Sequence, residues 1–257
     1  MHRHVVALCA ALSMSGTLVT AQGPPPPPIN IIGVEPLELG EVVTGAPFTA
    51  DAVSELTQEL ADGNRIERRS TSVVARDSAG RVRREQALPQ LGPVVVEPEL
   101  RLVTISDPAR KVVYTIDEAR RTVSRFPMPP AGPPGRRGGF GEGPRGGRPP
   151  LPPPRVASEP LGTRQIAGVR TDGTRQTMTI PAGVFGNTRS MSVVTERWFS
   201  PELKIVVESR TMDPRTGDVF YHVVRLERSE PARDLFEVPS DYTVIERSRP
   251  GPGPRPR

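Results

Sequence analysis

The sequence predicts a mostly β protein: a single curved antiparallel sheet, an incomplete β-barrel, with few short helical turns. Two observations support this fold class. Residues 161–244 alternate between short segments rich in β-branched residues and short polar turns, which is typical of antiparallel strands. The same pattern recurs upstream, where residues 61–64 (Ala-Asp-Gly-Asn) are a strong hairpin turn. We expect roughly nine to eleven strands with one apolar face.

The strands before residue 127 are expected to form a meander. Residues 49–60 fit both helical and strand spacing, and the hairpin turn that follows them favours a strand. Residues 88–98 contain prolines and are interpreted as a crossing rather than a strand. The other strands of this part are expected at residues 65–76, 81–87, 100–106, 111–116 and 121–126.

The second half of the sheet is expected to have equally short strands. They are predicted at residues 174–180, 191–199, 203–211 and 219–228, with turns at 171–173, 200–202 and 213–218. Residues 231–236 are predicted to form a short helical turn, and Leu235, Phe236 and Val238 are predicted to close one end of the sheet. The β domain is expected to span residues 48–244, and residues 245–257 to form a disordered basic tail.

The amino-terminal residues have the pattern of a secretory signal peptide, residues 1–21, with cleavage near Ala21. We therefore expect an exported protein, periplasmic or extracellular, with no transmembrane segment in the mature chain. Cys9, the single cysteine, would leave with the signal, which excludes disulfides and thiol chemistry. A proline-rich lead-in is expected at residues 22–47.

A proline-, glycine- and arginine-rich segment, residues 127–157, is expected to be a disordered insertion within the one β domain. It has five arginines against one glutamate, and four more arginines lie in the tail, although the whole chain is only +5. The folded part is therefore mildly acidic, so nucleic acid is not expected as a partner. An anionic envelope polymer is one candidate partner of the insertion and tail, and a solvated linker without a partner is the plainer alternative.

The residue types needed for catalysis are scarce. Outside the signal, His222 is the only histidine, and it shares an apolar strand face. Glu196 and Glu208 could serve a carboxylate-based hydrolase, but pairing of Glu196 with an arginine across the sheet is favoured. The glycine-rich residues 181–187 precede a strand rather than a helix, which argues against a phosphate loop. We expect a protein that is not an enzyme and has no metal or cofactor.

The apolar face of the second half supplies the candidate ligand-binding residues. If the sheet encloses a cavity of a few hundred Å³ or more, these residues would line it, with Phe185 at the rim; otherwise they form a packed core. The candidates are Phe185, Val194, Trp198, Phe220, His222 and Val224.

Two motifs resemble those of known exported proteins. Residues 161–169 (Leu-Gly-Thr-Arg-Gln-Ile-Ala-Gly-Val) and 230–242, with Leu235-Phe236-Glu237-Val238-Pro239 at their centre, are similar to the opening and closing motifs of bacterial proteins related to outer-membrane lipoprotein carriers. Residues 179–183 and 196–203 resemble a group of exported proteins of soil bacteria. The resemblance implies a half-barrel sheet with an apolar concave side that holds acyl chains.

One apolar sheet face and no visible catalytic set of residues lead to a hypothesis about function. The leading hypothesis is a non-enzymatic binding or carrier protein for an apolar envelope ligand, a lipid or a lipoprotein. The alternative is a structural or adhesive envelope protein that contacts anionic polymers through its arginine-rich segments. The sequence shows no convincing pattern of the long amphipathic helix that covers the cavity in the carriers.

Overall fold

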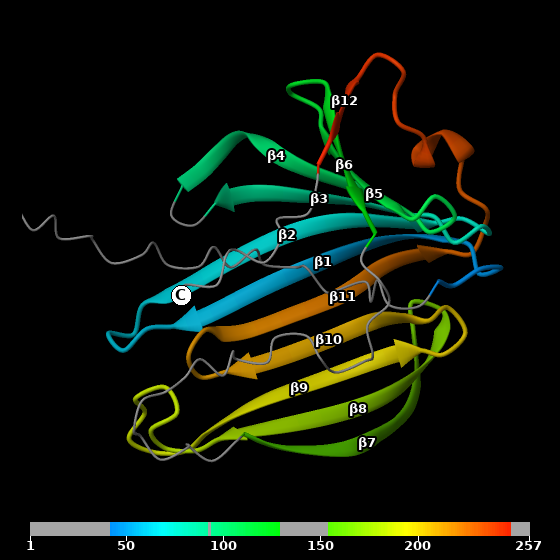
Figure 1. Ribbon diagram of the computed structural model, residues 1–257. Helices are drawn as coiled ribbons and strands as arrows, with labels where there is room; N and C mark the ends of the chain where they lie inside the picture. The colour runs from blue at the N-terminus through cyan, green and yellow to red at the C-terminus, as the bar shows by residue number, and fades with distance from the viewer. Residues whose placement is uncertain (1–41, 92–93, 129–153, 248–257) are drawn as a thin grey trace, which may run out of the picture.

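The computed structural model describes residues 42–91, 94–128 and 154–247, which form one twelve-stranded sheet and one short helix (Figure 1). The first six strands are β1 (Phe48–Glu59), β2 (Arg65–Arg76), β3 (Val82–Leu91), β4 (Val94–Asp107), β5 (Val112–Asp117) and β6 (Thr122–Pro127). The other elements are β7 (Arg155–Ile166), β8 (Val169–Ile180), β9 (Met191–Ser200), β10 (Ile205–Asp213), β11 (Gly217–Glu227), the 3₁₀ helix η1 (Arg233–Phe236) and β12 (Thr243–Glu246).

The sheet consists of two meanders joined side by side. Its strand order is β12-β6-β5-β4-β3-β2-β1-β11-β10-β9-β8-β7. All neighbours are antiparallel except β12, which pairs parallel with β6. β7 and β12 are the two edges, so the sheet is open, and Figure 1 shows it curving along its length. The mostly β, curved and open fold predicted from the sequence is confirmed.

The pairing of β1 with β11 joins the two meanders. Val53 lies opposite His222, although the two residues are far apart in the chain. The larger core cluster extends across this seam, since Phe48 and Val74 of the first meander pack with Val207 and Tyr221 of the second. The residues before and after the 129–153 segment therefore contribute to one sheet and share a core.

A second core cluster lies on the outer face of β4, β5 and β6. Its members are Val103, Ile105, Ile116 and Val123, and the chain after η1 covers them with Val238 and Tyr242. The helix itself is fixed by Phe236, which is 2% exposed and lies 5.0 Å from the Arg81 guanidinium. The predicted helical turn at residues 231–236 is confirmed.

Two local predictions are wrong. Residues 171–173 are not a turn but part of β8; the hairpin turn is at Ala167 and Gly168, which have φ angles of 48° and 78°. Such positive φ angles at both turn residues match the right-handed twist of the flanking strands. Residues 88–98 are not a crossing, because β3 and β4 pair through this range, with a register shift between Leu88 and Gln90 that accommodates the intervening proline.

The other differences from the prediction concern the number of strands and where they begin and end. The structure has twelve strands rather than nine to eleven, because β7, where the sequence showed only a motif, and β12 add to the sheet. β6 runs to Pro127 and β7 begins at Arg155, so the ends of the expected 127–157 insertion are strand. The signal peptide, the lead-in up to residue 41, residues 129–153 and the tail from 248 lie outside the described residues, and the expectations for them stay predictions. In the described part, no helix has the length and apolarity needed to cross a membrane.

Candidate ligand-binding cavity

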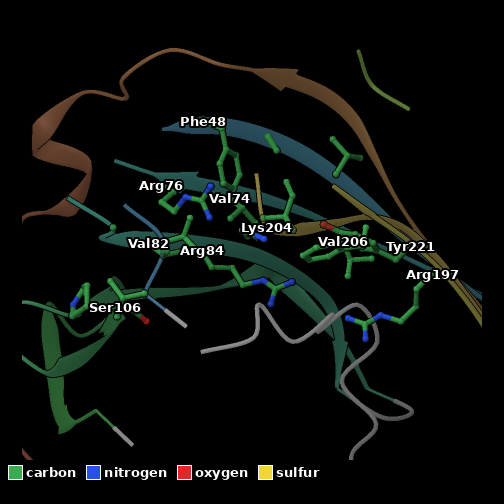
Figure 2. Close-up of a pocket in the computed structure, with 18 of the residues that line it drawn as sticks. Phe48, Val74, Arg76, Val82, Arg84, Ser106, Arg197, Lys204, Val206 and Tyr221 are labelled. Atoms are coloured by element: carbon green, nitrogen blue, oxygen red, sulfur yellow. The ribbon is translucent and has the colours of Figure 1, made fainter. Parts of the chain in front are cut away.

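Seven neighbouring strands, from β4 through β1 to β9, contribute residues to one cavity on the concave face of the sheet (Figure 2). Its volume is about 120 Å³. The apolar and small residues that line it are Val42, Val43, Phe48, Ala50, Val74, Gly80, Val82, Ser106, Pro108, Met128, Phe199, Ile205, Val206, Tyr221 and Val223. The remaining lining residues are cationic: Arg76, Arg84, Arg197 and Lys204.

Strand alternation produces the apolar wall. Phe48 and Ala50 of β1 are followed at the same spacing by Ala52, and all three are almost fully buried. Val74 lies opposite Ala50 on β2, and paired residues of antiparallel strands point to the same side of a sheet. The strand register therefore places these apolar side chains together on the inner face of the seam, where they are part of the larger core cluster.

The cations of the cavity have no acidic neighbour among its lining residues, as far as the structure describes them. Figure 2 shows Arg76, Arg84 and Arg197 projecting from β2, β3 and β9 around the same space. Elsewhere on the described surface most arginines form ion pairs, as Arg175 does with Glu159 and Arg225 does with Asp51. Of the cavity cations, Arg76 and Lys204 form no such ion pair with a described residue.

Arg76 is the most deeply buried of these cations, with 3% of the residue exposed. Its Nε and Nη2 donate to the Ala46 carbonyl at 2.9 and 2.8 Å, and Nη2 also donates to the Leu203 carbonyl at 2.6 Å. The guanidinium lies 4.8 Å from the centre of the Phe48 ring. Burial lowers the pKa of Arg76 from its ordinary value, because desolvation disfavours the charged form.

Lys204 is adjacent to the carbonyl that Arg76 binds. It ends the turn between β9 and β10 with a φ angle of 54°, and its N–H donates to the Ser200 carbonyl at 2.8 Å. The residue is exposed and is among those that line the cavity. Together, Arg76 and Lys204 place one buried and one exposed positive charge at the same end of the cavity.

The six residues predicted from the sequence lie elsewhere. None of them is among the lining residues of this cavity: Phe185, Val194, Trp198, Phe220, His222 and Val224. On β11 the inner face carries Tyr221 and Val223, so its alternate residues Phe220 and His222 point to the outer face. Trp198 shares that face, because Trp198 and His222 are both paired with Glu208. The prediction that these six residues contact a ligand therefore remains untested.

The outer-face residues make contacts with one another. The Arg164 guanidinium lies 3.7 Å from the Trp198 ring centre and forms an ion pair with Glu208. Phe220 and His222 are stacked with ring centroids 4.9 Å apart. The Nδ1 atom of His222 is buried and has no hydrogen-bond partner among the described residues.

The remaining candidates are separate from that group. Val194 is half-buried on β9. Val224 is 55% exposed, at the β-bulge where β11 shifts register against β1. Phe185 is 47% exposed in the β8–β9 loop, with Arg215 4.9 Å from its ring centre.

The carboxylates singled out in the sequence are paired with arginines. Arg175 donates to Glu196 through Nε at 2.9 Å and Nη2 at 2.7 Å, from the position directly opposite on β8. The predicted pairing of Glu196 is confirmed. Glu208 forms an ion pair with Arg164 of β7 through Nη2. Within the described ranges, no cluster of three or more histidine, cysteine or acidic residues is arranged to hold a metal ion.

Sequence reasoning missed the cationic residues of the cavity, although one signal was available. Arg76 follows Val74 by two positions on a predicted strand, so it had to share the face of that valine. An arginine on the apolar side of a strand is uncommon unless it has a partner. Lys204 gave no comparable signal, because a lysine at a turn is ordinary.

Comparison with known proteins gives a distant likeness in fold. Neither a protein-family model nor a curated protein matches the chain in sequence. Among solved structures, an uncharacterized conserved protein from Thermus thermophilus is 12% identical with a TM-score of 0.41, over 79% of this chain and 91% of that one. A chain of the MucA/MucB complex of Pseudomonas aeruginosa is 14% identical with a TM-score of 0.41, over 80% of this chain and 60% of that one.

A third similar structure is a domain from Vibrio parahaemolyticus described as that of an outer membrane lipoprotein-sorting protein. It is 9% identical with a TM-score of 0.22, over 74% of this chain and 89% of that one.

Proposed function

We propose that this chain is an exported, non-enzymatic binding or carrier protein for an apolar envelope ligand, a lipid or a lipoprotein. The observation that supports this function is the cavity on the concave face, with apolar walls formed by residues such as Phe48, Val74 and Val223. Burying an apolar chain there removes its surface from water, at about 25 cal/mol per Å². Export rests on the amino-terminal signal pattern.

The size of the cavity limits what it can hold. At about 120 Å³ it is below the few hundred Å³ that the sequence analysis set as the mark of a binding cavity, and below the roughly 300–1,000 Å³ of clefts that enclose a drug-sized molecule. The ligand would therefore insert one segment, such as the end of an acyl chain, and leave the rest outside.

The absence of enzymatic activity is part of the proposal. Glu196 and Glu208 are occupied by arginines on the outer face, and His222 lies on that face as well. A general acid or base must reach the reacting group of a bound substrate, and these three residues are on the wrong side of the sheet for a ligand in the cavity.

The test is to identify and then displace the ligand. Native mass spectrometry and lipid extraction of the full chain, purified from its own envelope, should yield a bound apolar molecule. Val206→Phe fills the cavity from a half-buried lining position, whereas Val73→Phe adds the same ring at a 41% exposed position outside it. We expect at least about a tenfold loss of bound ligand for V206F and none for V73F. Equal loading of both variants would contradict the proposal.

A further inference from the structure

We infer that the cavity binds the oxyanion head group of an amphiphile, with Arg76 and Lys204 as the groups that hold it. This inference rests on the proposed function and specifies the ligand class: a single apolar chain that ends in a carboxylate or a phosphate.

The first argument is the buried charge of Arg76. A guanidinium taken out of water is costly unless an anion compensates it. Its hydrogen-bond partners, Ala46 and Leu203, contribute only carbonyl oxygens, and no carboxylate within the described residues lies within ion-pair distance. Nη1 makes no hydrogen bond in that part of the chain, so one side of the planar guanidinium is available to an incoming oxyanion.

The second argument is the position of Lys204. Its ammonium forms no ion pair with any described residue, and it adjoins the Leu203 carbonyl that orients Arg76. Arg84 and Arg197 lie on the same walls, and no acidic residue is among the described residues that line them. An anion entering from the rim meets Lys204 first and the buried Arg76 beyond it, and no carboxylate of that lining repels it on the way.

The third argument is the apolar wall beside these charges. The Phe48 ring contacts the Arg76 guanidinium, and Ala50 and Val74 continue the apolar surface from it. A small inorganic anion would use the cations and leave this surface dry and empty. An amphiphile uses both, because its head group pairs with the arginine while its chain lies along the valine and alanine side chains.

The experiment compares ligands of equal chain length. Laurate, dodecanol and inorganic phosphate are titrated into the full chain by calorimetry. The wild type should bind laurate at least about tenfold more tightly than dodecanol, and increasing salt should reduce that ratio. Arg76→Met removes the buried charge and should abolish the preference for laurate.

Lys204→Asn is the second variant, in case loss of Arg76 prevents folding. Asparagine tolerates the left-handed backbone of this position, and laurate binding should weaken about three- to fivefold. Lys111→Asn is the matched control: Lys111 is exposed, has a φ angle of 55° and is outside the cavity lining. Laurate binding should be unchanged in K111N.

Equal binding of laurate and dodecanol, unaffected by K204N, would overturn the head-group inference and leave the apolar carrier function intact. Binding of phosphate alone, lost in K204N, with no binding of either chain, would overturn the amphiphile and the carrier function together. If none of the three probes binds, both the inference and the proposed function are wrong.

Discussion

Trp198 is the single tryptophan of the chain, and its packing makes Gly173 sensitive to substitution. A Cβ atom at Gly173 would lie 2.6 Å from Cζ3 and 2.7 Å from Cη2 of the indole ring. The Arg164 guanidinium lies 3.7 Å from the centre of the ring, and this contact restricts how the ring can move. We expect Gly173→Ala to lower the free energy of unfolding by about 1–3 kcal/mol and to red-shift the tryptophan emission.

The control is a double-mutant cycle with Trp198→Leu. Removing the ring should relieve the clash, so G173A should cost much less in the W198L background. An equal loss in both backgrounds would show that the cost comes from the backbone of β8 rather than from the indole. Urea denaturation followed by circular dichroism suits both backgrounds, since it does not depend on the tryptophan.

Asp213 makes the stability of the β10–β11 turn depend on pH. Hydrogen bonds from the Arg215 side chain, at 2.9 and 2.5 Å, hold the pKa of Asp213 below its ordinary value. The carboxylate therefore stabilises the fold above about pH 4, the unfolded pKa of an aspartate, and this contribution is lost as pH falls through the lower folded pKa. Asp213→Asn should cost about 1 kcal/mol at pH 7.

The pH profile separates charge from geometry in this turn. Asparagine keeps an Oδ1 acceptor for the backbone N–H of Arg215, which Asp213 now accepts at 2.9 Å. It loses the charge and the Oδ2 acceptor of Arg215 Nη2, and only the loss of charge depends on pH. The difference in unfolding free energy between wild type and D213N should be constant near neutral pH and shrink below about pH 4. A difference that stays constant down to about pH 2 would contradict this origin.

At the scale of elements, the seam between β1 and β11 depends on Gly217. This residue begins β11 with a φ angle of 93°, and a Cβ atom there would lie 2.4 Å from the Thr57 carbonyl oxygen of β1. Gly217→Ala combines backbone strain with a clash against the neighbouring strand. We expect a loss of about 3 kcal/mol in the free energy of unfolding, measured by urea denaturation.

Gly186→Ala is the matched control for the seam. Gly186 has a φ angle of 79°, but a Cβ atom there would meet nothing within 4 Å. G186A should therefore cost only the strain of the left-handed conformation, about 1 kcal/mol. If G217A and G186A are equally destabilising, contact with β1 is not the cause.

The positions of most strands were predictable from the sequence, because turns and strands favour different residue types. The turn at residues 61–64 decided in favour of a strand over residues 49–60, and β1 confirms it. The same reasoning failed at Asp172-Gly173, where the glycine is required by the Trp198 ring and not by a turn. Local sequence does not distinguish these two reasons for a glycine. The pairing of β1 with β11 could not be predicted from local sequence either, because it joins residues that are far apart in the chain.

The choice of face could not be predicted either. Along β11 both alternating sets are apolar: Phe220 and Val224 on one side, Tyr221 and Val223 on the other. Periodicity therefore shows a strand but not which side is concave. The cavity residue Arg76 was identifiable by its spacing from Val74, whereas its lack of an acidic partner among the described residues is visible only in three dimensions.

At the scale of the molecule, β6 and β7 lie near opposite ends of the strand order, and β7 is itself an edge. Ten strand spacings of about 4.8 Å separate them along the sheet, roughly 48 Å. The chain between them can reach this far, since about 25 residues extend to roughly 80 Å. Deleting the segment would strain the sheet, so its role is better tested by substitution at constant length.

The final prediction concerns the arginines of that segment. Arg136, Arg137, Arg145 and Arg148 lie outside the described residues, and replacing all four by serine changes charge without changing length. If these arginines contact an anionic envelope polymer, the variant should elute from a heparin column at lower salt than wild type. Its unfolding free energy and its laurate affinity should be unchanged, because both depend on the sheet. Unchanged elution would favour a linker without a partner, whereas lost laurate binding would show that the segment also serves the cavity.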